Sequence, residues 1–199
     1  MALQQITSGD INSTTGTGST VVLSATPTLT SPTITGASIS SMASSVITSG
    51  TSVASTSGTS IDFTSIPSWV KRITVMFSGV STSGSSNLLL QIGGASGVST
   101  SGYLSSATRE STVGTVNGTA GFALTANIGS TTLLHGIITV VNLSGNTWSG
   151  SALLAHSDGN CMNSSAGSKA LSEVLTRVRI TAVNGTDTFD AGSINIFYE

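Results

Sequence analysis

The chain has 199 residues, a length that suits one domain of ordinary size with an appendage. It contains 6 Lys and Arg and 8 Asp and Glu, so charged residues make up 7% of it, against about a quarter in an average globular protein. A basic surface able to follow a phosphate backbone is therefore excluded, and nucleic acid is not an expected partner. With 38% hydrophobic residues and a net charge of −2, most of the chain is expected to fold.

Ser, Thr, Asn and Gly have to provide the solubility that charge does not. A neutral surface gives little protection against sheets sticking to one another, so sheet edges must be paired or covered, and this indicates an assembly. The single cysteine, Cys161, excludes an intrachain disulfide framework and is predicted to be a free thiol without a special role. The start, "MALQQITSGD", lacks the features of a signal peptide, and the aliphatic run "GIITVVNL" is too short to span a bilayer. We therefore expect synthesis in a cytoplasm and no membrane insertion.

Between Asp10 and Asp62 the chain has no charged residue and is dominated by Ser, Thr and Gly. The stretch "TPTLTSPTITGASIS", residues 26–40, divides into pentads that each carry one aliphatic residue, in turn Leu29, Ile34 and Ile39. Ordering one residue costs about 1 to 2 kcal/mol, and burying one Ile or Leu returns roughly 1.5 to 3 kcal/mol. Such a ribbon cannot hold itself together alone. It is either a flexible linker or, as we favour, an extended β-stalk ordered by other chains.

We assign residues 1–57 to this stalk and predict that three chains bury Leu29, Ile34 and Ile39 around a common axis. From residue 58 the sequence changes to dense period-2 alternation, which predicts that residues 58–199 form an antiparallel β-sandwich of jelly-roll-like character. The predicted inward positions are Ile61, Phe63, Ile73, Val75, Phe77, Val178, Ile180, Ala182, Ile194, Ile196 and Tyr198. The fold class is therefore all-β, a stalk followed by a sandwich.

Two local features refine the sandwich prediction. The Asn-Gly dipeptides in "VNGT" at 116–119 and at 183–186 predict tight hairpins. The only stretch in which a helix is credible is "AGSKALSEVL", residues 166–175.

Two stretches resemble proteins of tailed bacteriophages. "GTGSTVVLSATPTLTSPTITGA", residues 16–37, is similar to the low-complexity connector of many tail-fibre proteins. "GTSIDFTSIPSWVKRITVMFSGVSTSGSSNLLLQIG", residues 58–93, resembles the opening of a β-rich module of virion and tail-fibre proteins, and its "IPSWVKRITVMF" is the more specific part. The resemblance implies a non-enzymatic virion protein, commonly a homotrimer, on the fibre or baseplate side of the particle. Residues 100–199 match no motif of that family.

The expected function is thus assembly and host-surface adhesion in a virion, with no cofactor. The expected partners are two further copies of the chain, other virion proteins bound through the N-terminal region, and a host-surface glycan. Three alternatives stay open: a capsid decoration or head-fibre protein, a secreted bacterial adhesin, and a depolymerising tailspike enzyme. The adhesin would need an export signal, and the tailspike would need paired acids in the groove of a long β-helix.

Catalytic residues are not expected. His135 opens an aliphatic strand and is predicted to be structural, and His156 lies beside Ser157 and Asp158 on a turn. Adjacent residues on a turn point apart, whereas a catalytic triad needs groups that converge from the fold. The close acid pair Asp187 and Asp190 is predicted to flank a hairpin rather than to form a hydrolytic site. A metal bound by His156 and Asp158 on a trimer axis remains an alternative.

Sugar binding is the more plausible chemistry for the body. It needs an exposed aromatic ring with polar groups around it, and Trp148, with Asn146 and Thr147 beside it, is predicted on a loop between strands. Tyr103 in "STSGYLSS" is a similar candidate. The alternative for Trp148 is a loop anchor or a plug between subunits.

The remaining aromatic and charged residues are predicted to be structural. Trp69, just ahead of a strand, is expected in the core. The strand-borne cations Lys71, Arg72, Arg177 and Arg179 are expected to pair with Asp62, Glu173 or acids of a neighbouring subunit.

Overall fold

The computed structural model describes residues 47–110, 114–157 and 161–199, and Leu29, Ile34 and Ile39 of the predicted stalk lie outside these residues. The described part contains strands and no helix, as the all-β prediction requires. It likewise contains no helix long and apolar enough to cross a membrane. The strands are β1 (Thr48–Ser49), β2 (Val53–Ala54), β3 (Ser60–Phe63), β4 (Arg72–Thr82), β5 (Leu88–Gly94), β6 (Gly97–Val98), β7 (Leu104–Arg109), β8 (Thr115–Gly118), β9 (Phe122–Ala123), β10 (Leu134–Ser144), β11 (Thr147–His156), β12 (Cys161–Ala170), β13 (Arg177–Ala182) and β14 (Phe189–Tyr198).

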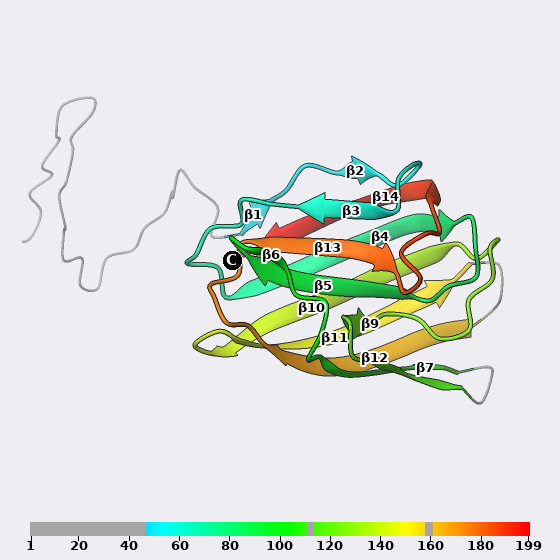
Figure 1. Cartoon of the computed structure of the whole chain (residues 1–199). Helices are drawn as coiled ribbons and strands as arrows, with labels where there is room; N and C mark the ends of the chain where they lie inside the picture. Colours follow the sequence, from blue (N-terminus) through cyan, green and yellow to red (C-terminus); the bar gives the residue numbers. More distant parts are fainter. Residues whose placement is uncertain (1–46, 111–113, 158–160) are drawn as a thin grey trace, which may run out of the picture. The chain divides into compact units, whose positions relative to one another are not determined.

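These strands form two antiparallel sheets packed face to face (Figure 1). The large sheet has the order β1-β14-β4-β10-β11-β12-β7-β8, with β2 also paired to β14. The small sheet has the order β3-β13-β5-β6, with β9 paired to β5. Strands β10, β11 and β12 are consecutive and follow one another as a meander, so the centre of the large sheet is built from local pairings. The predicted antiparallel sandwich is confirmed.

The core lies between the sheets and follows the predicted alternation. In β4 the side chains of Ile73, Val75 and Phe77 are buried, and in β13 those of Val178 and Ile180 are fully buried. Successive residues of a strand face opposite sides of a sheet, so the residues between these point outward. The same alternation in β14 places Ile194 and Ile196 inward, with Tyr198 partly buried against the core.

The sandwich begins earlier in the chain than the sequence indicated. Thr48 and Ser49 of β1 pair with Tyr198 and Phe197, and β2 pairs with the same strand further along. The richness of residues 47–57 in Ser and Thr predicts that they belong to the stalk, and this is wrong. Their backbone groups instead extend the edge of the large sheet, where pairing does not require large side chains.

Neither Asn-Gly dipeptide makes the predicted hairpin. Asn117 and Gly118 lie inside β8, which pairs only with β7 among the described strands, and the chain then crosses to the small sheet as β9. The second dipeptide does lie in a turn, where the N–H of Gly185 donates to the carbonyl of Ala182 at 3.0 Å. That turn connects β13 of the small sheet to β14 of the large sheet. Turn chemistry was therefore present at 183–186, but the strands it joins belong to different layers.

The helix considered for residues 166–175 is also absent. The first half of this stretch is the end of β12, which is paired on both sides, with β11 and β7. Ladder hydrogen bonds with two neighbours outweigh the weak helix preference of "AGSKAL".

Candidate interaction surfaces

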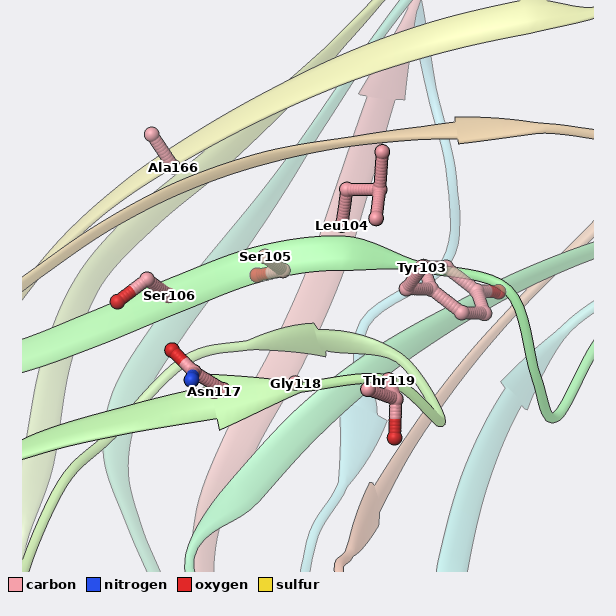
Figure 2. A pocket seen from close by; sticks show the side chains of 8 residues that line it. All are labelled: Tyr103, Leu104, Ser105, Ser106, Asn117, Gly118, Thr119 and Ala166. Carbon is pink, nitrogen blue, oxygen red and sulfur yellow. The ribbon is translucent and has the colours of Figure 1, made fainter.

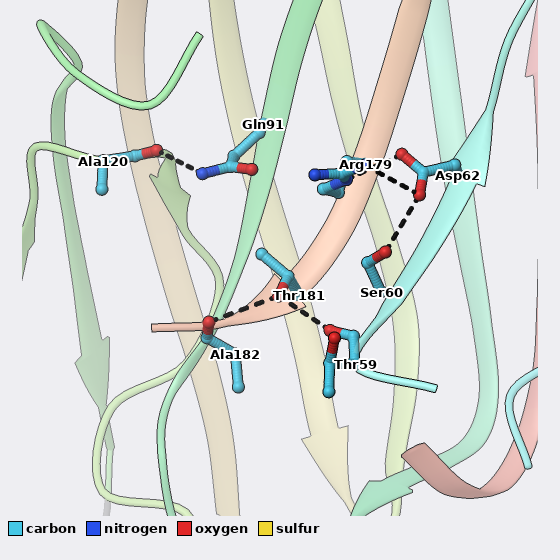
Figure 3. Close-up of polar contacts among 8 residues, drawn as sticks. All are labelled: Thr59, Ser60, Asp62, Gln91, Ala120, Arg179, Thr181 and Ala182. Atoms are coloured by element: carbon cyan, nitrogen blue, oxygen red, sulfur yellow. Dashed lines mark hydrogen bonds and ion pairs between the residues drawn. The ribbon is translucent and has the colours of Figure 1, made fainter. Parts of the chain in front are cut away.

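The two outward faces of the sandwich differ in chemistry. The outer face of the small sheet is polar (Figure 3): Arg179 forms an ion pair with Asp62 at 2.7 Å, and Ser60 donates to the same carboxylate at 3.0 Å. Beside them, the amide of Gln91 donates to the carbonyl of Ala120 at 3.0 Å. These groups satisfy one another, which is typical of a face that remains in water. The predicted pairing of Arg179 with Asp62 is confirmed.

The outer face of the large sheet carries almost no charge. Cross-strand registers align its outward side chains in three rows that run across the sheet. The first row is Asn195, Met76, Ile137, Leu153, Ser164, Thr108 and Thr115. The second row is Phe197, Thr74, Thr139, Ser151, Ala166, Ser106 and Asn117. The third row is Arg72, Val141, Ser149, Ser168 and Leu104.

Within the three rows Arg72 is the only charged residue, and it is paired with Glu199 at the corner of the sheet. Three aliphatic side chains are about half exposed: Ile137 by 45%, Leu153 by 48% and Val141 by 42%. Their neighbours along the strands, such as Ile138 and Leu154, are buried in the core. The exposure is therefore a property of this face and not of loosely packed strands.

A pocket of about 410 Å³ lies where this face reaches β12, β7 and β8 (Figure 2). Ser106 is the register partner of both Ala166 and Asn117, so these three line it together. Its remaining lining residues are Tyr103, Leu104, Ser105, Gly118 and Thr119. The pocket thus offers hydroxyl and amide groups and no charge.

Tyr103 lines this pocket, but it is not the exposed ring that the sequence led us to expect. Its side chain is 1% exposed, and the ring packs edge-on against Phe122, with centroids 5.2 Å apart. The ammonium group of Lys169 lies 5.2 Å from the centroid of the Tyr103 ring. With its ring enclosed in this way, Tyr103 cannot act as a stacking platform for a sugar.

Trp148 is also buried, and the prediction that it lies exposed on a loop between strands is wrong. It is the second residue of β11 and is 4% exposed, because it points inward from the strand while Ser149 points outward. Its indole N–H has no hydrogen-bond partner among the described residues. Asn146 lies in the turn before β11, and Thr147 is the first residue of that strand. Both are partly exposed, but the buried ring of Trp148 gives them no aromatic surface on which a sugar could stack.

The exposed tryptophan is Trp69, which was expected in the core. It lies in the turn before β4, is 54% exposed and contacts Tyr198 at a centroid distance of 6.1 Å. The turn places Val70, not Trp69, in the core. Next to this aromatic pair a small pocket of about 70 Å³ is lined by Ile47, Arg72, Thr74, Phe197, Tyr198 and Glu199. Only this corner of the described body joins exposed aromatic surface to charged groups.

A buried polar cluster escaped the sequence analysis. His156 and Cys161 face each other across β11 and β12, and the imidazole Nε2 of His156 contacts the amide of Asn163. That amide also accepts from the backbone N–H of Ala126 at 2.9 Å, and the Nε–H of Arg109 donates to the Cys161 sulfur at 3.1 Å. His156, Cys161 and Asn163 are all buried. Because their side chains are enclosed, they serve to tie the strands together rather than to meet a substrate.

Metal binding finds no support in the described residues, which contain no group of three His, Cys, Asp or Glu side chains able to hold an ion. Asp158, the second ligand of the metal alternative, lies outside them. His135, which was predicted to be structural, accepts at Nδ1 from the backbone N–H of Gly79 at 3.2 Å and so links β10 to β4.

Several other acids and cations have local partners. Asp187 accepts from the N–H of Ser86 at 3.0 Å, and Asp190 accepts from the hydroxyl of Ser81. The two acids thus hold the start of β14 and the loop before it against the end of β4 and the loop after it. Glu173 accepts from the N–H of Ser96 at 3.1 Å instead of pairing with an arginine. Lys71 contacts the amide of Asn142 at 3.4 Å, and Arg177 contacts the carbonyl of Ala95 at 3.4 Å.

Comparison of the chain with models of protein families, with curated proteins and with solved structures found no match.

Proposed function

We propose that this protein is a non-enzymatic structural component of a bacteriophage virion, a tail fibre or baseplate-associated fibre that acts in assembly and host-surface adhesion. The observation that carries the proposal is the set of three outward rows on the large sheet, in which Arg72 at one corner is the only charged residue and Ile137, Leu153 and Val141 are about half exposed. Monomeric soluble proteins rarely leave such a face uncovered, and exposed apolar patches mark interaction sites. The resemblance of residues 16–37 and 58–93 to fibre proteins agrees with this.

In this proposal the N-terminal residues 1–46 are the attachment and trimerisation segment, shortened from residues 1–57 because β1 and β2 belong to the body. The body contacts neighbouring virion proteins and the host surface. Three weak binding sites held in one particle gain effective concentration, so that a low affinity for each glycan becomes useful avidity.

The adhesive site is assigned to the corner formed by Trp69 and Tyr198, in place of Trp148 and Tyr103. An exposed indole offers a flat apolar surface with a polar edge. Arg72 and Glu199 lie beside it and supply hydrogen-bond donors and acceptors. The ligand class that fits is a host-surface saccharide that stacks one ring face and presents hydroxyl groups to the ion pair.

Particle association tests the structural role. A lysate in which the protein is expressed with its phage is separated on a density gradient, and the fractions are probed with an antibody against the body. The proposal expects the protein to sediment with infectious particles and to remain there after a salt wash. Protein found only in the unsedimented fraction would contradict it.

The adhesive site is tested separately with the fluorescently labelled full chain and host cells. Trp69→Ala should lower the amount bound several-fold. Val183→Ala should not, because this exposed residue lies in the turn before β14, at the end of that strand opposite to Tyr198. Equal binding by both variants would remove the Trp69 corner from the proposal without touching the structural role.

A further inference from the structure

We infer that the three outward rows of the large sheet form an interface with the same face of a second copy of this chain. The inference rests on the proposed assembly role. The N-terminal segment would join three copies, and this face would join copies in pairs, because an interface between identical faces is two-fold. The polar outer face of the small sheet would stay in water.

The first argument is the size of the face. The three rows hold 19 outward positions. With strands about 4.8 Å apart and residues of one face about 6.6 Å apart along a strand, these positions present roughly 600 Å². Specific protein interfaces bury about 1,200 to 2,000 Å² in total, which is about 600 to 1,000 Å² on each partner. The face therefore reaches the lower end of the size that a specific interface between two copies needs.

The second argument is charge. A surface that meets its own copy brings like charges together if it carries any, and buried unpaired charges are costly. In the three rows the only charge is Arg72, whose guanidinium is already neutralised by Glu199 at the corner. Two copies of this face can approach with no ion to desolvate at the centre.

The third argument is shape. Met76, Ile137 and Leu153 are direct cross-strand neighbours and form a ridge of large side chains in the first row. The second row beside it has only small side chains at the centre, namely Thr74, Thr139, Ser151, Ala166 and Ser106. A ridge of three side chains next to a longer shallow groove can interlock with its own copy. The ridge of one copy then occupies the groove of the other.

A second copy fits this face better than the N-terminal segment of the same chain. Residues 26–40 carry one aliphatic side chain in five, so they would cover the ridge with few apolar contacts. A second copy supplies a complete ridge of its own. The free energy from burying apolar surface, about 25 cal/mol per Å², is therefore larger for the self-interface.

The test places a photocrosslinker at the centre of the second row. Ser151→Cys in the full-length chain is labelled with benzophenone maleimide, irradiated, and the products are separated by mass and sequenced. The unaltered chain, whose one thiol Cys161 is buried, is the labelling control, and Val183→Cys, in the exposed turn after β13, is the positional control. The expected product is a covalent dimer whose crosslink lies in residues 137–168 of the other copy.

Adding Leu153→Lys to the Ser151→Cys chain should reduce the dimer product at least tenfold, whereas adding Val183→Lys should leave it unchanged. A crosslink from the labelled position 151 to residues 1–46 would overturn the inference, as would the absence of any crosslink in a folded chain. Circular dichroism of each variant confirms folding. Particle association is measured independently, so an absent self-interface in a protein that still sediments with particles would refute the inference and leave the proposed function standing.

Discussion

The hydroxyl of Tyr103 is hydrogen-bonded to the backbone of Ile92 from both sides. It accepts from the Ile92 N–H at 2.8 Å, and the carbonyls of Ile92 and Ser99 both lie 3.1 Å from it as acceptors. Tyr103 directly precedes β7 of the large sheet, and Ile92 lies in β5 of the small sheet. One buried phenol thus joins the two layers where ladder hydrogen bonds cannot.

Tyr103→Phe should destabilise the fold while leaving it intact. The substitution keeps the ring against Phe122 but leaves the buried N–H of Ile92 without its partner. An unsatisfied buried donor costs about 1 to 3 kcal/mol. Urea unfolding at neutral pH measures the difference, and a change below about 0.5 kcal/mol would show that water or another group replaces the phenol.

The same residue makes stability depend on alkaline pH. Burial raises the pKa of Tyr103 from its ordinary value of 10.0 to about 12, against the smaller lowering effect of the hydrogen bond from Ile92. A group with a raised pKa in the folded state contributes its full stability below pH 10, and this contribution declines as pH rises from 10 to 12. The total loss is on the order of 2 to 3 kcal/mol. Between pH 9 and pH 11.5 the native chain should therefore lose more unfolding free energy than Tyr103→Phe, and parallel losses would contradict the assignment.

The two tryptophans should behave oppositely toward a quencher. Trp69 is exposed at the corner next to Tyr198, whereas Trp148 points into the core. Acrylamide should therefore quench only part of the native emission, and Trp69→Phe should leave a blue-shifted band that resists quenching. If Trp69→Phe retained the quenchable fraction, the exposures of the two rings would be reversed and the adhesive corner would lose its aromatic platform.

Gly192 should not tolerate alanine. It has a φ of +87° at a bulge between β14 and β4, and a Cβ there would lie 2.4 Å from the carbonyl oxygen of Gly79. Gly185, with a φ of +69° and nothing within 4 Å of such a Cβ, is the matched control for backbone strain alone. Alanine at a positive φ costs of order 1 to 3 kcal/mol. Gly192→Ala should cost clearly more than Gly185→Ala in thermal unfolding, and equal costs would show that the bulge shifts to make room.

The layer structure could be read from the sequence because its signal is a repeated local pattern. The alternation around Ile73, Val75 and Phe77, and around Val178 and Ile180, predicted which side chains are buried, and these predictions are confirmed. Burial on one face of a strand leaves a period of two in the sequence, whatever the topology.

The turns and the aromatic sites were less predictable because they depend on which layer each strand joins. Asn117 and Gly118 have the composition of a hairpin turn, yet β7 pairs with them as part of a strand. Trp148 was predicted to be exposed and is buried, whereas Trp69 was predicted to be buried and is exposed. Alternate residues of a strand face opposite sides of the sheet, so the direction of each ring depends on the residue at which the strand begins. A shift of one residue at the turn after Gly145, or at the turn before β4, exchanges inward and outward side chains. The outward rows of the large sheet are invisible in sequence because they align residues from seven separate strands.

The central claim, a structural role in a virion, is tested most directly by immunogold electron microscopy of intact particles with an antibody against the body. Gold is expected at the fibres or baseplate, on the tail side of the particle. Gold distributed over the capsid would instead identify a decoration or head-fibre protein. Particles without gold, from a lysate that contains the protein, would contradict the account.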